Sequence, residues 1–323
     1  MLARGMLAVL PFVAALAAEA QPAGRMPRVG LLSPEPFPGE RDAIFLKRLS
    51  ELGWTEGRNL VLERRSAQNS LPRLPQLASE LAALKVDVIV AITTPAVAAA
   101  RDATRTIPIV MAPAGDALGS GFVTNLARPG GNVTGVTFTH ETIGLKRLEL
   151  LREVLPGLER VAILASAQNR LLHEPMWVSS ESAARFLNVV ARRYEVRGPQ
   201  EIAQAIQAIA KDRAGPVVVL PGSDFASARA RLAELALGAR LPTLCDRMEY
   251  VEAGCLMSYG GSLTEIVRQA AGHLDRILKG ARAGDLPVEQ PYRFELIINA
   301  RTAKALGVTI PPSMLIRADR VIE

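Results

Sequence analysis

The sequence predicts an α/β protein of two lobes, each built on a parallel sheet covered by helices. The chain has 323 residues, and a single core rarely grows beyond about 250 to 300 residues. Short apolar runs alternate with amphipathic helical patterns, which is typical of parallel βαβ units. The alternation restarts half-way along the chain, which predicts a second lobe. Aromatic residues make up 4% of the chain, so the layers are expected to be aliphatic.

The first lobe is predicted from residues 28 to 112. Aliphatic and β-branched runs of strand length indicate strands at 28–33 (RVGLLS), 59–65, 86–92 and 107–112. Apolar residues at helical spacing predict the intervening helices at 42–54, 74–85 and 94–104. A glycine, Gly53, provides the stop signal of the first helix.

The second lobe is predicted from residue 144 onward. Strands are expected at 161–165, near Tyr194 at a sheet edge, and at 217–222, 241–246 and 255–260. Helices are expected at 144–157, 182–190, 201–215, 225–239 and 262–280. Gly280 marks the end of the last of these helices.

The N-terminus has the parts of a secretory signal peptide. Residues 1–20 carry an Arg, a short apolar run and a small-x-small end before Gln21. The alternative is a membrane anchor, but the apolar run is shorter than the roughly 20 residues that a spanning helix needs. Cleavage near Ala20 and a periplasmic location are therefore predicted.

The basic composition does not indicate a nucleic-acid partner. The formal net charge is +6, but the Lys and Arg residues are scattered along predicted helices without interleaved aromatics, so we interpret them as solvated helix faces. The two cysteines, Cys245 and Cys255, lie ten residues apart. This spacing fixes no geometry, so a disulfide and two buried free thiols both remain open.

No catalytic or metal motif is present in the sequence. The chain lacks GxGxxG, GxxxxGK[ST], GxSxG and HExxH, and its histidines, His140, His173 and His273, stand far apart. A lone carboxylate without a nucleophile, metal or cofactor anchors a ligand more often than it catalyses a reaction. We therefore expect no enzyme activity, no metal and no cofactor.

Small hydroxyl and acidic residues follow the predicted strands, where parallel sheets bind ligands. Hydroxyl groups and amides can hold a carboxylate, and an aspartate can hold an ammonium group. The alternative is that these side chains only cap the helices that follow. The candidate ligand-binding residues of this kind are Ser33, Thr93, Thr94, Asp116, Thr137, Ser166, Ser223, Asp224 and Asp246.

A turn-rich stretch at 113–135 contains LARPGGNVTG. Such a stretch can cradle a phosphate, form a hinge or reverse the chain. Together with four other blocks it resembles the family of ABC transporter substrate-binding proteins, whose TrpX-like members bind aromatic amino acids. The similar blocks are 52–60 (LGWTEGRNL), 86–104, 107–136, 241–260 and 286–311.

The resemblance implies a type I periplasmic-binding-protein clamshell, in which two Rossmann-like lobes are joined by three hinge crossovers. Residues 28–137 and 259–290 would form lobe 1, and residues 138–258 and 291–323 would form lobe 2, with the C-terminal placement left open. LARPGGNVTG then leads into the first crossover, where Gly130 and Gly131 allow φ values that other residues resist. The same resemblance adds Tyr259, at the second hinge, to the candidate ligand-binding residues.

We therefore expect an exported, monomeric solute receptor that captures a small molecule and delivers it to an ABC permease at the membrane. The ligand class is an amino acid, with an aromatic one favoured, or a related carboxylate. Phe37, Phe138, Phe225 and Tyr259 are candidates for stacking on an aromatic ring. A periplasmic ligand sensor, a sugar-binding variant and an α/β enzyme are the alternatives.

Overall fold

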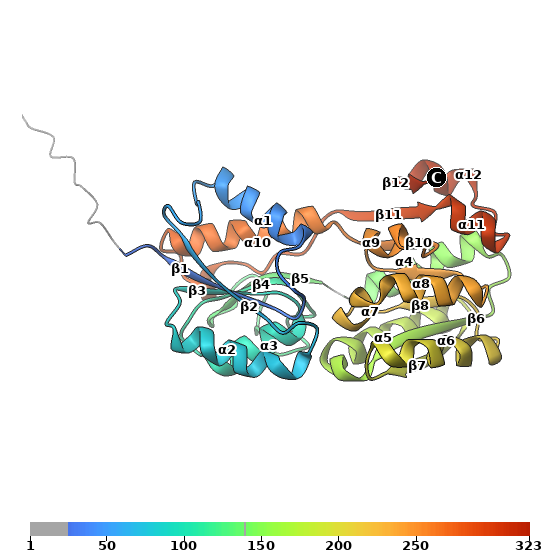
Figure 1. Ribbon diagram of the computed structural model, residues 1–323, viewed down its shortest axis with the longest axis horizontal. Helices are drawn as coiled ribbons and strands as arrows, with labels where there is room; N and C mark the ends of the chain where they lie inside the picture. The colour runs from blue at the N-terminus through green and yellow to red at the C-terminus, as the bar shows by residue number, and fades with distance from the viewer. Residues whose placement is uncertain (1–24, 139) are drawn as a thin grey trace, which may run out of the picture.

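A computed structural model describes residues 25–138 and 140–323, with residues 140–142 described by their backbone only. Within this part of the chain the strands form two sheets, and Figure 1 shows them in two lobes that lie side by side. The strand orders are β2-β1-β3-β4-β5 and β12-β11-β10-β9-β8-β6-β7. The two-lobe α/β prediction is confirmed.

The first lobe is a fully parallel sheet between two pairs of helices. In Figure 1, α1 and α10 cover one face of the sheet and α2 and α3 cover the other. Its elements are β1 (Arg28–Ser33), α1 (Glu40–Glu51), β2 (Val61–Ser66), η1 (Leu71–Arg73), α2 (Leu74–Ala83), β3 (Val88–Ala91), α3 (Thr94–Ala103), β4 (Ile109–Gly115), β5 (Val133–Phe138), α10 (Leu263–Leu278) and η4 (Ala283–Asp285).

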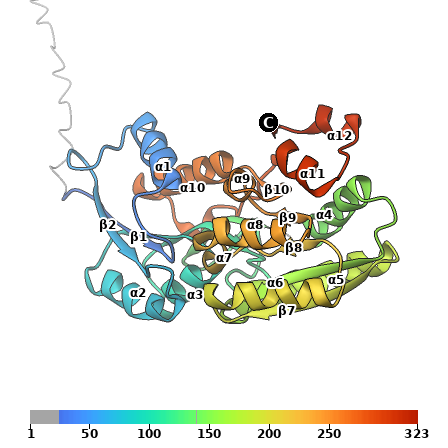
Figure 2. The ribbon, with the colours of Figure 1, turned by 45° about the vertical axis from the view of Figure 1, so that its right-hand side comes forward.

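The second lobe is packed in the same way, with α4 and α5 on one face and α6 and α8 on the other. The views in Figures 1 and 2 place the C-terminal helices α11 and α12 on this lobe. Its elements are α4 (His140–Val154), β6 (Arg160–Ser166), η2 (Ala167–Asn169), α5 (Arg170–Phe186), β7 (Val190–Val196), η3 (Pro199–Glu201), α6 (Ile202–Lys211), β8 (Val217–Val219), α7 (Ser223–Ser227), α8 (Arg229–Gly238), β9 (Thr243–Cys245), α9 (Met248–Glu252), β10 (Met257–Gly261), β11 (Phe294–Asn299), α11 (Ala300–Leu306), α12 (Pro312–Arg317) and β12 (Arg320–Ile322).

Some elements differ from the sequence prediction. The helix expected at 182–190 begins twelve residues earlier as α5, which contains Pro175, and Val190 already belongs to strand β7. The helix expected at 225–239 is divided into α7 and α8 at Ala228. Strand β11 runs antiparallel to β10, because it enters the sheet directly from the other lobe rather than through a crossover helix.

Strand β5 was not among the expected strands. It is the edge strand of the first sheet, where Gly135 has a φ of +122° and lies against the backbone of Met111. A Cβ atom at this glycine would lie 2.5 Å from Met111 N and O, so the close approach of β5 to β4 requires glycine.

Three crossings join the lobes. The chain passes from β5 to α4, from β10 to α10, and from the segment after Glu289 into β11. Tyr259 lies within β10, and its strand belongs to the second sheet up to Gly261. Cys245 and Cys255, for which the sequence left two states open, are free thiols buried in the second lobe.

Candidate functional site

A cavity of about 970 Å³, part of it open to solvent, lies between the two lobes. Its walls come from the carboxyl ends of strands in both sheets and from the helices that follow them. This is the edge at which parallel sheets offer helix N-termini and free backbone groups to a ligand. The crossings therefore place one shared space between the two sets of strand ends.

Four of the sequence-predicted site residues line this cavity: Thr93, Thr94, Ser223 and Asp246. Thr94 Oγ1 accepts a hydrogen bond of 2.9 Å from Gly115 N, so this hydroxyl braces the adjacent strand end. Thr93 has a φ of +80°, and its hydroxyl is buried without a hydrogen-bond partner among the described residues. A buried polar atom without a partner costs free energy unless a ligand supplies one.

Ser33, Asp116 and Thr137 are predicted site residues that lie outside the cavity lining. Ser33 and Asp116 accept hydrogen bonds of 3.0 and 2.9 Å from backbone N–H groups of the loops in or beside which they lie, and Thr137 on β5 accepts one of 2.9 Å from Ala117 N in the loop after β4. These side chains thus stabilise loops, and none of the three donor N–H groups lies in a helix.

Ser166, Asp224 and Tyr259 also lie outside the lining. The Ser166 hydroxyl donates to the Asp224 carboxylate, and the Ser166 N–H donates to His173 Nδ1, which ties the loop after β6 to the loop after β8. Tyr259 stacks on Phe294, with a distance of 5.8 Å between the ring centroids.

The sequence prediction missed a buried arginine, Arg147, in helix α4. The residue is 4% exposed and lines the cavity. Its Nε donates a hydrogen bond of 3.0 Å to the Tyr259 carbonyl, which fixes the guanidinium plane. Among the described residues no carboxylate forms an ion pair with Arg147, and burial lowers its pKa although Asp246 acts in the opposite direction. The position had a sequence signal, because Arg147 lies on the apolar stripe of the helix, four residues from both Ile143 and Leu151.

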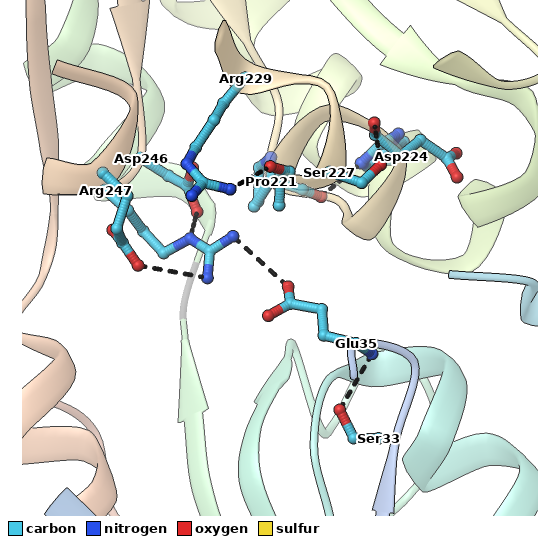
Figure 3. A network of polar contacts seen from close by, with 11 residues as sticks. Ser33, Glu35, Pro221, Asp224, Ser227, Arg229, Asp246 and Arg247 are labelled. Carbon is cyan, nitrogen blue, oxygen red and sulfur yellow. Dashed lines mark hydrogen bonds and ion pairs between the residues drawn. The ribbon is translucent and has the colours of Figure 1, made fainter. Parts of the chain in front are cut away.

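A second missed arginine, Arg247, connects the lobes (Figure 3). Its Nη2 lies 3.4 Å from Glu35 Oε1 of the first lobe, and its Nε lies 3.6 Å from Asp246 Oδ2. Burial acts to lower the pKa of Arg247, but Asp246 and Glu35 outweigh it and raise that pKa well above its usual range. Burial likewise acts to raise the pKa of Glu35, yet Arg247 and Arg41 hold it below the usual value.

Asp246 carries a carboxylate oxygen that remains available. Its Oδ1 is buried and has no hydrogen-bond partner among the described residues. Burial raises the pKa of Asp246, while Arg247 and Arg147 lower it in part. A carboxylate of this kind is suited to receive a positively charged group from a ligand.

Apolar side chains make up much of the remaining wall. They come from both lobes and include Leu71, Phe138, Ile143, Leu172, Met176 and Leu263. Of the four residues considered for ring stacking, Phe138 lines this cavity, whereas Phe37 lines a neighbouring one. Phe225 is fully buried against His173. The walls thus suit an apolar ligand body but provide mainly aliphatic contacts.

The described residues contain no group of three or more His, Cys, Asp or Glu side chains that could hold a metal ion. In the same part of the chain, no helix has both the length and the apolar character needed to cross a membrane. The predicted signal peptide at 1–20 lies outside the described residues.

A family model described as ABC transporter substrate binding protein matches residues 41–322. The chain belongs to this family. Substrate-binding proteins of the family bind a small-molecule ligand, work with an ABC permease and act outside the cytoplasm. The resemblance stated from the sequence blocks is therefore confirmed.

Individual relatives of this substrate-binding protein agree with the family match. The tyrosine-binding protein of Clostridioides difficile (strain R20291) is 30% identical over 272 residues, or 82% of this chain and 75% of that protein. A conserved domain protein from Vibrio cholerae O1 biovar El Tor strain N16961 has a crystal structure with a TM-score of 0.86 and 28% identity, covering 92% of this chain and 100% of that chain.

A third protein of the same fold was solved with L-Trp bound. It is an ABC domain from Streptococcus pneumoniae in complex with L-Trp, with a TM-score of 0.84 and 22% identity, covering 92% of this chain and 100% of that chain. These structures confirm the type I periplasmic-binding-protein fold that the resemblance implied.

Proposed function

We propose that this substrate-binding protein captures a zwitterionic amino acid with an apolar, preferably aromatic, side chain for an ABC importer. The observation that carries the proposal is the pair formed by Arg147 and Asp246. The Arg147 guanidinium has no ion pair among the described residues, and Asp246 Oδ1 has no partner there. Both side chains line the same cavity, and each shifts the pKa of the other in the direction that favours the charged form.

An α-amino acid supplies what both groups lack. Its carboxylate would accept from the free N–H groups of Arg147, and its ammonium group would donate to Asp246 Oδ1. The ammonium and carboxylate groups of the ligand are both attached to its Cα atom, which suits two protein groups of opposite charge that line the same cavity. An uncharged sugar would leave the Arg147 cation buried without a counter-ion, which is costly.

The names of relatives support this ligand class. One relative is a tyrosine-binding protein, and another was solved with L-Trp. The aliphatic wall formed by residues such as Leu172 and Met176 gives an aromatic side chain a dry surface to contact.

Closure of the lobes would follow from contacts made across the cavity. The Glu35–Arg247 ion pair joins the two lobes, and the first lobe would move as one body against the second. Ligand binding favours closure only through contacts present in the closed state. We further propose that the protein acts as a monomer without enzyme activity or nucleic-acid binding, after removal of a signal peptide near Ala20.

The proposal is tested with purified mature protein and a panel of amino acids, deaminated aromatic acids and sugars. We expect L-amino acids with large apolar side chains to raise the melting temperature and to give measurable heats in titration calorimetry. The deaminated acids are expected to bind at least tenfold more weakly, because they leave Asp246 without a partner. Stabilisation by sugars alone, or turnover of any ligand, would contradict the proposal.

A further inference from the structure

Asn169 is a buried amide in the cavity wall that makes no hydrogen bond through its side chain in the described structure. The residue is 6% exposed, it lines the cavity between the lobes, and its Oδ1 is buried without a partner. Asparagine side chains buried to this extent are nearly always hydrogen-bonded. A partner that arrives with the ligand would resolve this exception.

The usual structural role of such a residue is not fulfilled here. Asn169 is the N-cap of α5, a position where asparagine normally accepts a hydrogen bond from the first helical turn. The side chain makes no such bond. Its amide is thus available to the cavity, although capping would stabilise the helix by about 1 kcal/mol.

The strand order places this amide apart from the charged anchors. Asn169 follows β6, Asp246 follows β9, and Arg147 is bonded to β10, in the order β10-β9-β8-β6. Two strands, β9 and β8, thus lie between the strand that Arg147 contacts and the strand that leads to Asn169. A ligand held at its charged head by Arg147 and Asp246 therefore needs a spacer between this head and a group that reaches the Asn169 amide.

We infer that Asn169 determines specificity by binding a hydroxyl group at the far end of the ligand, so that a tyrosine-like amino acid is preferred over phenylalanine. The inference rests on the proposed function. An aromatic ring provides such a spacer, because a tyrosine-like ligand carries one six-membered ring between its charged head and the hydroxyl. A hydroxyl both donates and accepts, so it pairs with either orientation of the amide.

The surroundings of Asn169 favour a neutral group over a charged one. Leu172 and Met176 of α5 line the same part of the wall, and a second carboxylate or ammonium would have to be desolvated against them. When phenylalanine binds, the amide stays buried without a partner.

The experiment measures the dissociation constants of L-tyrosine, L-phenylalanine and L-O-methyltyrosine by titration calorimetry. Wild-type protein is expected to bind L-tyrosine about ten- to a hundredfold more tightly than L-phenylalanine. O-methyltyrosine, which cannot donate and is larger, should bind at least about tenfold more weakly than tyrosine. In Asn169→Leu, the tyrosine-to-phenylalanine ratio should fall to about one, whereas Gln207→Leu, an amide change on the exposed face of α6, should keep the wild-type ratio.

The outcomes separate the inference from the function on which it rests. Equal affinity of the wild type for tyrosine and phenylalanine would overturn the role of Asn169 and leave the amino-acid function standing. An unchanged ratio in Asn169→Leu would do the same. Binding of neither amino acid by the wild type would overturn the proposed function and this inference together. The wild-type ligand series decides the question even if Asn169→Leu does not fold.

Discussion

Replacement of Arg147 by methionine is expected to abolish tight ligand binding without weakening the ligand-free fold. Arg147 is 4% exposed, and its free N–H groups are proposed to hold the ligand carboxylate. Removing one partner of a buried, hydrogen-bonded charge pair costs about 2 to 5 kcal/mol of binding. At 1.4 kcal/mol per tenfold, the dissociation constant should rise about 30- to 4,000-fold.

The stability of the ligand-free protein, in contrast, should not fall. The variant loses the hydrogen bond from Nε to the Tyr259 carbonyl, which is worth about 1.5 to 3 kcal/mol for a charged donor. It also removes a buried cation whose pKa is lowered by burial, which means that the folded protein disfavours the charge. Burying an ion without a counter-ion costs several kcal/mol, so its removal offsets the lost hydrogen bond. The free energy of unfolding is therefore expected to be unchanged or higher.

Titration calorimetry gives the affinity, and urea unfolding without ligand gives the stability. Arg152→Met, an exposed change on the same helix, is the matched control and should alter neither. Affinity of Arg147→Met within about threefold of the wild type would refute the anchoring role. A large loss of ligand-free stability would refute the view that Arg147 is kept for the ligand rather than for the fold.

Three further variants test the ion pair between the lobes, a buried histidine and a glycine in the cavity wall. Glu35→Gln removes the partly exposed pair with Arg247, so the dissociation constant should rise about two- to fivefold, less so at high salt, with a more open average shape in solution scattering. Burial lowers the pKa of His173, so as the pH falls this histidine is protonated in the unfolded chain before it is protonated in the folded protein. The free energy of unfolding should therefore be constant above about pH 6.5 and fall below it. His173→Gln should flatten this decline, as measured by urea unfolding between about pH 8 and 5. Gly260→Ala places a Cβ atom 2.0 Å from the Asp246 carbonyl oxygen, and unfolding in urea should show a loss of about 1 to 3 kcal/mol.

The fold was predictable because its strands and helices follow simple periodicities. Strand β1 has the expected bounds, Arg28–Ser33, because a short apolar run flanked by turn residues is typical of a buried strand. Strand β5 was missed because its sequence contains a glycine and follows a turn-rich stretch, and its edge position depends on a close contact with β4. Local sequence carries no information on such a tertiary contact.

The site was predictable in its location but not in its chemistry. The rule for strand ends located the loops, and Asp246 and Thr93 do line the cavity. The rule cannot tell which hydroxyl groups already accept a hydrogen bond from a backbone N–H group. The Thr137 hydroxyl, for example, accepts one from Ala117. The arginines were missed because a charge within a helical pattern usually faces solvent; the apolar neighbours of Arg147 at four-residue spacing were the available signal.

The distribution of the unpartnered groups between the lobes indicates the order of events. Arg147, Asp246 and Asn169 all belong to the second lobe, whereas the first lobe contributes Thr93, the unpartnered Nε of Arg41 and the Glu35 contact with Arg247. A ligand can therefore satisfy its charged head and its far end on the second lobe before the first lobe arrives. Closure then adds the Glu35–Arg247 ion pair and excludes water from the charged groups. The exclusion of water strengthens the ion pairs that the ligand has already made with the second lobe. On this argument, changes at Glu35 act on closure and release, whereas changes at Arg147 act on capture itself, because an open protein still presents its anchors.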